Sequence, residues 1–183
     1  GTCSVIAGQF PKRFFNHIGA TEVDPDTICN AAGHAALSYV FGDSAAGFDP
    51  RTSKDSKCIL IWGANPAHCG PHVYQHWLRE HGAEVIVIDP VRTETAASAD
   101  LHLQIRPGSD AALAFSMLHI MREESLVDEN YIKNHVQGYE EVLPSIENCT
   151  PEWGQSETGI PTTLIEQAAR LYARGPSLLW LGQ

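Results

Sequence analysis

Three short polar segments of the sequence carry side chains that could hold a nucleotide, and each directly follows an apolar run. The segments are Trp62-Gly63-Ala64-Asn65-Pro66, Asp89-Pro90-Val91-Arg92-Thr93 and Arg106-Pro107-Gly108-Ser109-Asp110. Ligands of open α/β sheets bind beyond the carboxyl ends of the strands. If the apolar runs are neighbouring parallel strands, the three segments meet at one edge, and together they indicate a site more strongly than any one alone.

The first segment offers a close backbone approach and a versatile amide. Gly63 can adopt a positive φ angle at the end of a strand, and the Asn65 side chain has both hydrogen-bond donors and an acceptor. The same residues would also make an ordinary turn between a strand and a helix. Taken alone, this segment leaves both interpretations open.

The second segment places a carboxylate and a cation after the next apolar run. Asp89 stands where dinucleotide-binding folds hydrogen-bond the ribose hydroxyls, and Arg92 and Thr93 could reach a phosphate. The alternative is that Asp89 caps the turn that follows it and that Arg92 lies on the surface.

The third segment precedes a predicted helix. Ser109 or Asp110 is a natural N-cap for that helix, and the Asp110 carboxylate could also accept hydrogen bonds from the amino and imino groups of guanine. Capping and base recognition are compatible, and purely structural capping remains an alternative.

The elements that position these segments alternate along the chain. Apolar runs at 58–62, 84–88 and 177–181 predict strands that are buried on both faces, and 101–105 predicts a further strand whose alternating pattern is less apolar. Helices are predicted over 5–18, 27–41, 71–81, 110–124, 128–136, 140–146 and 162–172. This alternation is typical of a Rossmann-like, doubly wound α/β fold with a mainly parallel sheet and helices on both faces. We expect a single domain over residues 1–183, with both chain ends as cuts from a larger subunit.

Composition narrows the function further. The 183 residues carry a formal net charge of −10, so a basic surface for nucleic acid is not expected, and phosphate must be held locally by backbone N–H groups. No apolar run approaches the ~20 residues that span a bilayer, so no direct membrane insertion is expected. The five cysteines are odd in number and form no Cys-x-x-Cys pair, which favours reduced thiols over a disulfide framework or a four-cysteine iron–sulfur site.

One histidine series has a spacing that could build a zinc face on a helix. His68, His72 and His76 recur every four residues, with Cys69 beside the first. However, Gly70 and Pro71 place His68 outside the predicted helix over 71–81. We therefore predict no metal site there.

Residues 58–67, 87–100 and 106–113 together resemble the dimethyl sulfoxide reductase family of molybdopterin oxidoreductases, of the formate dehydrogenase and nitrate reductase type. In that family one strand ends in a Gly-x-Asn-Pro loop, a later one in Asp-Pro-Arg-x-Thr-x-Thr-Ala-x-x-Ala-Asp, and Arg-Pro-Gly-Thr-Asp-x-Ala-Leu follows. This chain departs from the pattern by Val91 before Arg92 and by Ser109 in place of threonine. The segment Thr158-Gly159-Ile160-Pro161 also resembles the family.

The resemblance implies a bis-molybdopterin guanine dinucleotide cofactor with molybdenum or tungsten, one of whose guanine dinucleotides these loops hold. The residues it implicates are Trp62, Gly63, Ala64, Asn65, Pro66, Ala67, Asp89, Pro90, Arg92, Thr93, Gly108, Ser109 and Asp110. It also implies an iron–sulfur cluster and a second pterin-binding domain elsewhere in the same catalytic subunit, and an iron–sulfur electron-transfer subunit as a partner. This chain alone is expected to be inactive.

The segment Cys29-Asn30-Ala31-Ala32-Gly33-His34 resembles the place where formate dehydrogenases carry the metal-ligating Cys or selenocysteine. That position falls on Gly33, so no metal ligand is expected from this position, and His34 becomes a candidate catalytic residue that either faces the substrate or lies next to the groups around the metal. If the alignment shifts, Cys29 is the nearest thiolate; alternatively it packs as a small buried residue.

Two other functions stay open from the sequence. A nucleotide- or thiamine-diphosphate-type central domain shares the buried strands and the Gly-Ala-Asn-Pro turn, although the motifs around Asp89 and Asp110 argue against it. The other is a structural domain of a redox subunit that has lost its cofactor, against which the intact loops argue.

Overall fold

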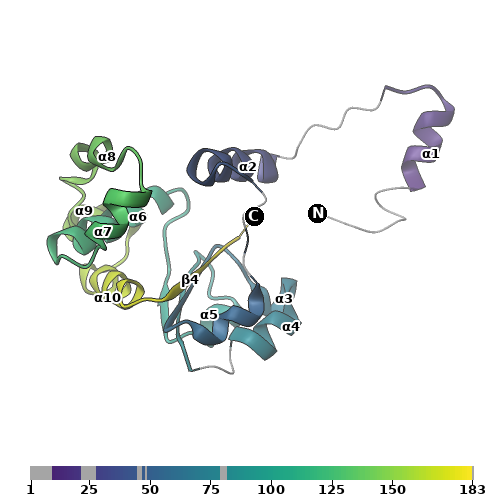
Figure 1. Ribbon diagram of the computed structural model, residues 1–183. Helices are drawn as coiled ribbons and strands as arrows, with labels where there is room; N and C mark the ends of the chain where they lie inside the picture. Colours follow the sequence, from purple (N-terminus) through teal and green to yellow (C-terminus); the bar gives the residue numbers. More distant parts are fainter. Residues whose placement is uncertain (1–9, 22–27, 45–46, 48, 79–81, 183) are drawn as a thin grey trace. The chain divides into compact units, whose positions relative to one another are not determined.

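The computed structural model describes residues 10–21, 28–44, 47, 49–78 and 82–182 in two compact units, Gly1–Ala46 and Gly47–Gln183. The first unit contains α1 (Phe10–His17) and α2 (Ile28–Phe41), which are labelled in Figure 1. The helix expected over 5–18 is thus observed from Phe10, and its earlier residues, like Thr27 of the second expected helix, lie outside the described residues. The expectation of one domain over the whole chain stays a prediction.

The second unit is built on a sheet of four parallel strands in the order β3-β2-β1-β4. The strands are β1 (Cys58–Trp62), β2 (Glu84–Ile88), β3 (Leu101–Leu103) and β4 (Ser177–Leu181). All four predicted strands are confirmed, and only the third is shorter than expected. Leu60 in β1 stands between Ile86 of β2 and Leu179 of β4.

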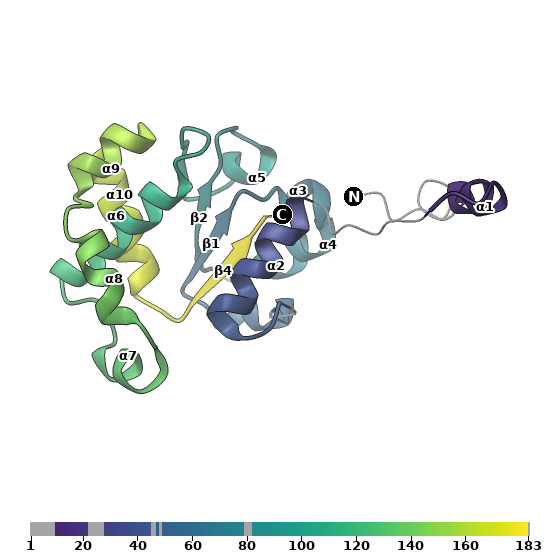
Figure 2. The same cartoon turned by 90° about the horizontal axis from the view of Figure 1, so that it is seen from above.

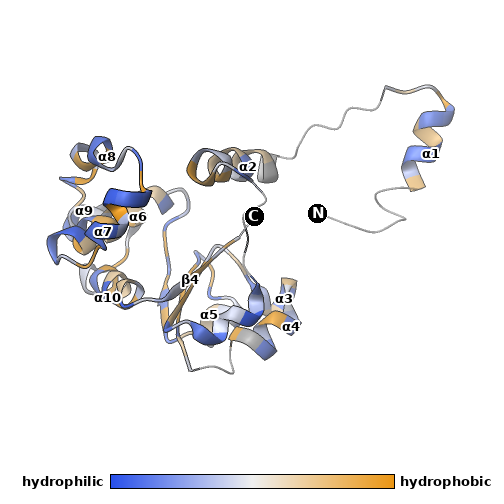
Figure 3. Ribbon diagram, viewed as in Figure 1, coloured by the Kyte–Doolittle hydropathy of each residue, from blue (hydrophilic) through white to orange (hydrophobic). Residues whose placement is uncertain are grey.

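Helices cover both faces of this sheet, which confirms the predicted fold class. On one face, Leu60 and Ile86 pack with side chains of α6 (Asp110–Glu123) and α10 (Thr162–Ala173). On the other face, Ile59, Ile61 and Val87 pack with Tyr74, Leu78 and Ala96. Figure 2 shows α6 and α10 on one side of the strands and α3 and α5 on the other. Burial from both sides explains why the central strand β1 is apolar throughout rather than alternating. In Figure 3 the strands of the sheet are mostly coloured as hydrophobic.

Four helical segments were absent from the sequence prediction or misplaced by it. The chain forms η2 (Pro50–Asp55), a 3₁₀ helix, where no helix was predicted, and adds α5 (Glu94–Ala97) and α9 (Pro151–Thr158). A fourth, α3 (Pro66–Cys69), is divided from the helix expected over 71–81, whose described residues form α4 (Pro71–Val73) and a π-helical turn, η3 (Tyr74–Leu78). The division occurs at Gly70 because a residue that precedes proline is disfavoured in the helical conformation; its φ is −147°.

The remaining helices agree with the prediction within one or two residues. They are α7 (Glu129–His135) and α8 (Tyr139–Ile146), together with α6 and α10. Within the part of the chain that the structure describes, no helix is long and apolar enough to cross a bilayer.

Candidate nucleotide-binding site

The first predicted loop lies at the end of the central strand and presents its backbone openly. Gly63 has a φ of +64°, and its N–H donates to the carbonyl of Ile88 at 2.8 Å, which ties the loop to the neighbouring strand. A Cβ atom built at Gly63 meets nothing within 4 Å. The space beside this glycine is therefore available for a ligand to approach the main chain.

Asn65 in the same loop is held by a residue that the sequence analysis missed. The Thr95 hydroxyl, in α5, donates to Asn65 Oδ1 at 2.7 Å and accepts from the Ala67 N–H at 3.1 Å. Thr95 is almost fully buried. Asn65 occupies the N-cap position of α3 but makes no side-chain cap, since its amide oxygen is taken by Thr95. The first loop is thus joined to the helix that follows the second loop.

The second loop begins with a carboxylate that organises its own turn. Asp89 Oδ1 accepts from the Val91 N–H at 2.7 Å, while His102 and Gln104 side chains contact the carbonyls of Asp89 and Pro90 at 2.9 and 3.0 Å. Asp89 therefore caps the turn that follows it, as one of the two interpretations of the sequence held. Among the described residues, the second oxygen of its carboxylate accepts no hydrogen bond.

Of the other two polar residues of the second loop, one lies on the surface and one caps a helix. Arg92 is exposed. Thr93 is the N-cap of α5 and accepts from the Ala96 N–H at 3.2 Å. Because the hydroxyl oxygen of Thr93 accepts that bond, its O–H remains able to donate to a ligand.

The third loop is anchored to a helix that the sequence analysis did not predict. The Arg106 guanidinium donates to the carbonyls of Ser156 and Glu157, at 3.2 and 2.8 Å, at the end of α9. Ser109 stands at the N-cap position of α6 without capping it, which corrects that alternative: its φ of −107° and ψ of 18° are not the extended cap conformation, and its hydroxyl donates to the Arg106 carbonyl instead.

A side-chain contact joins the first and third loops. The indole N–H of Trp62 donates to Asp110 Oδ1 at 2.8 Å, and the Asp110 side chain is otherwise exposed at the start of α6. Trp62 itself packs against the core on the α6 face of the sheet. All three predicted loops are thus brought to one edge of the sheet, where two side-chain contacts link them.

A hollow of about 440 Å³ adjoins this edge. Its lining comes from the first loop, from α3 and from the end of β4: Gly63, Ala64, Asn65, His68, Cys69, Trp180, Leu181 and Gly182. In a sheet of order β3-β2-β1-β4 the chain reverses its direction of progress between β1 and β4, which is where ligands of doubly wound folds bind. The open backbone at Gly63, the half-buried Asp89 and the exposed Asp110 fit a nucleotide held mainly by hydrogen bonds.

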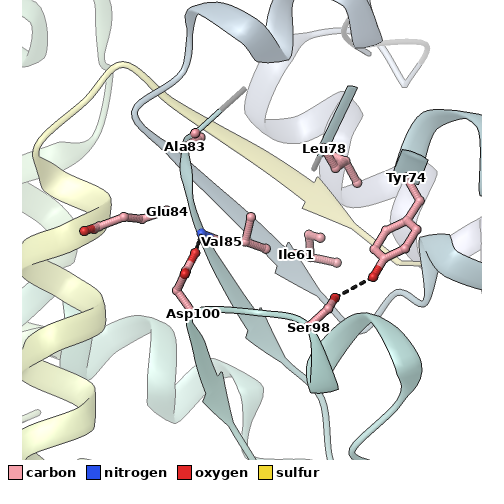
Figure 4. A pocket seen from close by; sticks show the side chains of 9 residues that line it. Ile61, Tyr74, Leu78, Ala83, Glu84, Val85, Ser98 and Asp100 are labelled. Atoms are coloured by element: carbon pink, nitrogen blue, oxygen red, sulfur yellow. Dashed lines mark hydrogen bonds between the residues drawn. The ribbon is translucent and has the colours of Figure 1, made fainter. Parts of the chain in front are cut away.

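A second hollow lies near the start of β2 and contains none of the predicted site residues (Figure 4). Its polar groups satisfy one another: the Tyr74 and Ser98 hydroxyls are hydrogen-bonded, and the Asp100 carboxylate accepts from the Val85 N–H at 2.8 Å. These contacts give it a structural role.

The histidine series does not gather into a metal site. The structure places His68 in α3, 3.4 Å from the Glu94 carboxylate, while the rings of His72 and His76 stack with centroids 6.5 Å apart. Among the described residues, no three His, Cys, Asp or Glu side chains are grouped to bind a metal ion.

The remaining predicted residues belong to the first unit. Gly33 and His34 lie in α2, and a Cβ atom at Gly33 meets nothing within 4 Å. Cys29 belongs to the same helix, and its side chain lies outside the described residues. The roles assigned to these three residues stay predictions.

One cysteine, Cys58, has a raised pKa because of its buried position in the fold. Burial at the start of β1 raises the pKa of the Cys58 thiol from 9.0 to about 11, with smaller contributions from Glu84 and Asp100. A thiol with this pKa is protonated and unreactive at neutral pH. It also lies at the opposite end of β1 from the three loops.

The sequence and the fold of this chain are similar to those of known proteins. Residues 2–178 match the family model described as molybdopterin oxidoreductase. The probable oxidoreductase YoaE of Bacillus subtilis is 33% identical over 181 residues, which are 97% of this chain and 26% of that protein. The F420-dependent formate dehydrogenase 1 subunit alpha of Methanococcus maripaludis is 37% identical over 157 residues, 84% of this chain and 23% of the relative.

A solved structure shares the fold. The acetylene hydratase from Pelobacter acetylenicus superposes with a TM-score of 0.74 over 94% of this chain and 24% of its own, at 24% sequence identity. The chain therefore spans about a quarter of the length of the proteins that it matches. The match over residues 2–178 confirms the resemblance found in the sequence: the chain belongs to the molybdopterin oxidoreductase family.

Proposed function

We propose that this chain holds one guanine dinucleotide of a bis-molybdopterin guanine dinucleotide cofactor, with molybdenum or tungsten, as one part of a longer catalytic subunit. The observation that supports this best is the meeting of three loops at one sheet edge, linked by the Trp62–Asp110 and Thr95–Asn65 hydrogen bonds. The family match favours this function over the thiamine-diphosphate alternative.

In this proposal each loop has a separate task. The free oxygen of Asp110 accepts hydrogen bonds from guanine, the free oxygen of Asp89 accepts from a ribose hydroxyl, and the backbone at Gly63 and Gly108 allows close approach. Phosphate is held by backbone N–H groups with Arg92 and the Thr93 hydroxyl, because a chain with a formal net charge of −10 must hold an anion by local donors. Ser109 contributes as an acceptor, since its O–H is already donated to Arg106.

The rest of the subunit completes the enzyme. The bound cofactor supplies oxidation–reduction chemistry at its metal, which this chain alone does not perform. We propose that the same subunit carries an iron–sulfur cluster and the second pterin-binding domain, and that a separate iron–sulfur subunit exchanges electrons with it. Within this chain, Gly33 offers the metal no side-chain ligand, and His34 faces the substrate.

The test is the cofactor content of the complete protein after dialysis under mild denaturant. Asp110→Ala and Asp89→Ala are each expected to weaken retention of the guanine dinucleotide by about 10- to 150-fold, the effect of losing a hydrogen bond to a charged group. Asp128→Ala is the matched control, because Asp128 caps α7 through the Tyr131 N–H and lies outside the loops. If both loop variants keep as much cofactor as the control, the loops are only turns and caps.

A further inference from the structure

The Asn65 amide can present either donors or an acceptor to a ligand. Its hydrogen bond with Thr95 determines which of the two faces the ligand. The Thr95 oxygen already accepts from the Ala67 N–H. Its hydrogen needs an acceptor, because Thr95 is only 1% exposed and a buried hydroxyl without one is costly. Asn65 Oδ1 lies 2.7 Å away and provides it.

The opposite orientation of the Asn65 amide is excluded, because the buried hydroxyl hydrogen of Thr95 needs an acceptor. If its NH₂ group pointed at Thr95, the Thr95 oxygen would accept two hydrogen bonds and its own buried hydrogen would have no partner. Amide orientation is assigned from such networks. The network therefore fixes Asn65 with its oxygen toward Thr95 and its NH₂ group away from it.

In this orientation the NH₂ group of Asn65 remains available to donate to a ligand. No hydrogen bond occupies it among the described residues, and it is not among the buried atoms that lack a partner. Asn65 lines the hollow of about 440 Å³ beside Gly63. The hollow thus receives an N–H donor from this side chain.

We infer that Thr95 is a positioning residue, which acts through Asn65 so that the site offers this donor to an acceptor oxygen of the ligand. This inference rests on the proposed function, which supplies the acceptor as a phosphate or carbonyl oxygen of the guanine dinucleotide. Thr95 itself lines neither hollow, so in this inference it acts on the ligand only through Asn65.

The experiment compares variants of the complete protein by the dissociation constant of the guanine dinucleotide, measured by equilibrium dialysis in mild denaturant. Asn65→Ala should weaken binding by about 10-fold or more, and Asn65→Asp should weaken it further, because a carboxylate still accepts from Thr95 but offers no donor and repels an anion. Thr95→Val should weaken binding by up to as much as Asn65→Ala, whereas Thr95→Ser should restore it.

The double variant Thr95→Val/Asn65→Ala separates positioning from a general structural role. It should bind no more weakly than Asn65→Ala alone, because Thr95 acts through Asn65. Additive losses, or an Asn65→Asp protein that binds as tightly as the unmodified one, would overturn the inference. Should Thr95→Val fail to fold, the Asn65→Asp comparison still tests the donor at Asn65 on which the inference depends, and a tight-binding Asn65→Asp protein overturns it.

The outcome is distinguishable from failure of the proposed function. If Asp110→Ala loses the cofactor while Asn65→Asp keeps it, only the assignment of Thr95 and Asn65 is wrong. If all of these variants keep it, the loops do not hold the dinucleotide at all.

Discussion

The indole N–H of Trp62, at the end of β1, donates a 2.8 Å hydrogen bond to the carboxylate of Asp110, the first residue of α6. The contact joins residues far apart in the sequence and fixes one oxygen of the carboxylate. Since the N–H group occupies that oxygen, only the other remains fully available to a ligand.

The energy of this contact can be measured by a double-mutant cycle. Trp62→Phe removes the donor and keeps an aromatic ring, and Asp110→Ala removes the acceptor. We expect a coupling free energy of about 1 kcal/mol in urea unfolding, at the low end for a charged partner because Asp110 is exposed. Additive effects of the two substitutions would show that the hydrogen bond contributes no stability.

Gly154, in the middle of α9, should not tolerate a side chain. A Cβ atom there would lie 2.5 Å from Ser116 Oγ, 2.8 Å from Ser116 Cβ and 3.1 Å from Ile165 Cδ1. Overpacking costs about 1–3 kcal/mol, against a gain of about 1 kcal/mol from better helix propensity. Gly154→Ala is therefore expected to lower the free energy of unfolding by up to about 2 kcal/mol.

The control for the Gly154→Ala substitution removes the side chain of Ser116, which a Cβ atom at Gly154 would meet. Both short contacts to Ser116 disappear in Ser116→Gly, so Gly154→Ala should destabilise that background less than it destabilises the unmodified chain. Equal losses in the two backgrounds, measured by thermal or urea unfolding, would show that Ser116 is not what limits this helix crossing.

The raised pKa of Cys58 predicts a loss of stability at alkaline pH. Between pH 9 and about 11 the thiol of the unfolded chain loses its proton while the buried thiol keeps it, so the folded state binds more protons and stability falls as the pH rises. This thiol contributes a slope of at most about 1.4 kcal/mol per pH unit, and contributes none below pH 8.

The slope is measured as the difference between the unmodified chain and Cys58→Ala in urea unfolding from pH 8 to 10. Burial also raises the pKa values of Cys149 and Tyr172, and both residues are present in each protein, so the difference mainly reports Cys58. Parallel stability curves would show that the thiol titrates alike in the folded and unfolded chains.

The strands could be predicted from the sequence because each is a short, mainly apolar run; Cys58–Trp62 is the clearest, and burial on both faces explains its lack of alternation. The missed helices lack that signal. Glu94–Ala97 spans four residues, and Pro151–Thr158 is polar with a glycine at its centre. For the latter, Thr150 before Pro151 was a usable start signal, since Thr150 caps the helix through the Trp153 N–H.

The site was predictable in its loops and not in its internal contacts. Position after a strand is a local property, so Gly63, Asp89 and Gly108 could be found from the order of residues alone. The hydrogen bonds from Thr95 to Asn65 and from Trp62 to Asp110 depend on how strands and helices stack in three dimensions. No spacing rule encodes such pairings, and Thr95 was therefore overlooked.

The order of the strands determines when the hollow beside Gly63 can form during synthesis of the chain. The hollow beside Gly63 is closed by Trp180, Leu181 and Gly182, at the end of the last strand, and the Gly182 N–H donates to the Trp62 carbonyl at 2.7 Å. Everything from β2 to α10 lies between those two strands in the sequence, and such distant pairings form late in folding. During synthesis on the ribosome, this cavity remains unfinished until β4 has emerged and docked, so a ligand that needs both walls enters only after that moment.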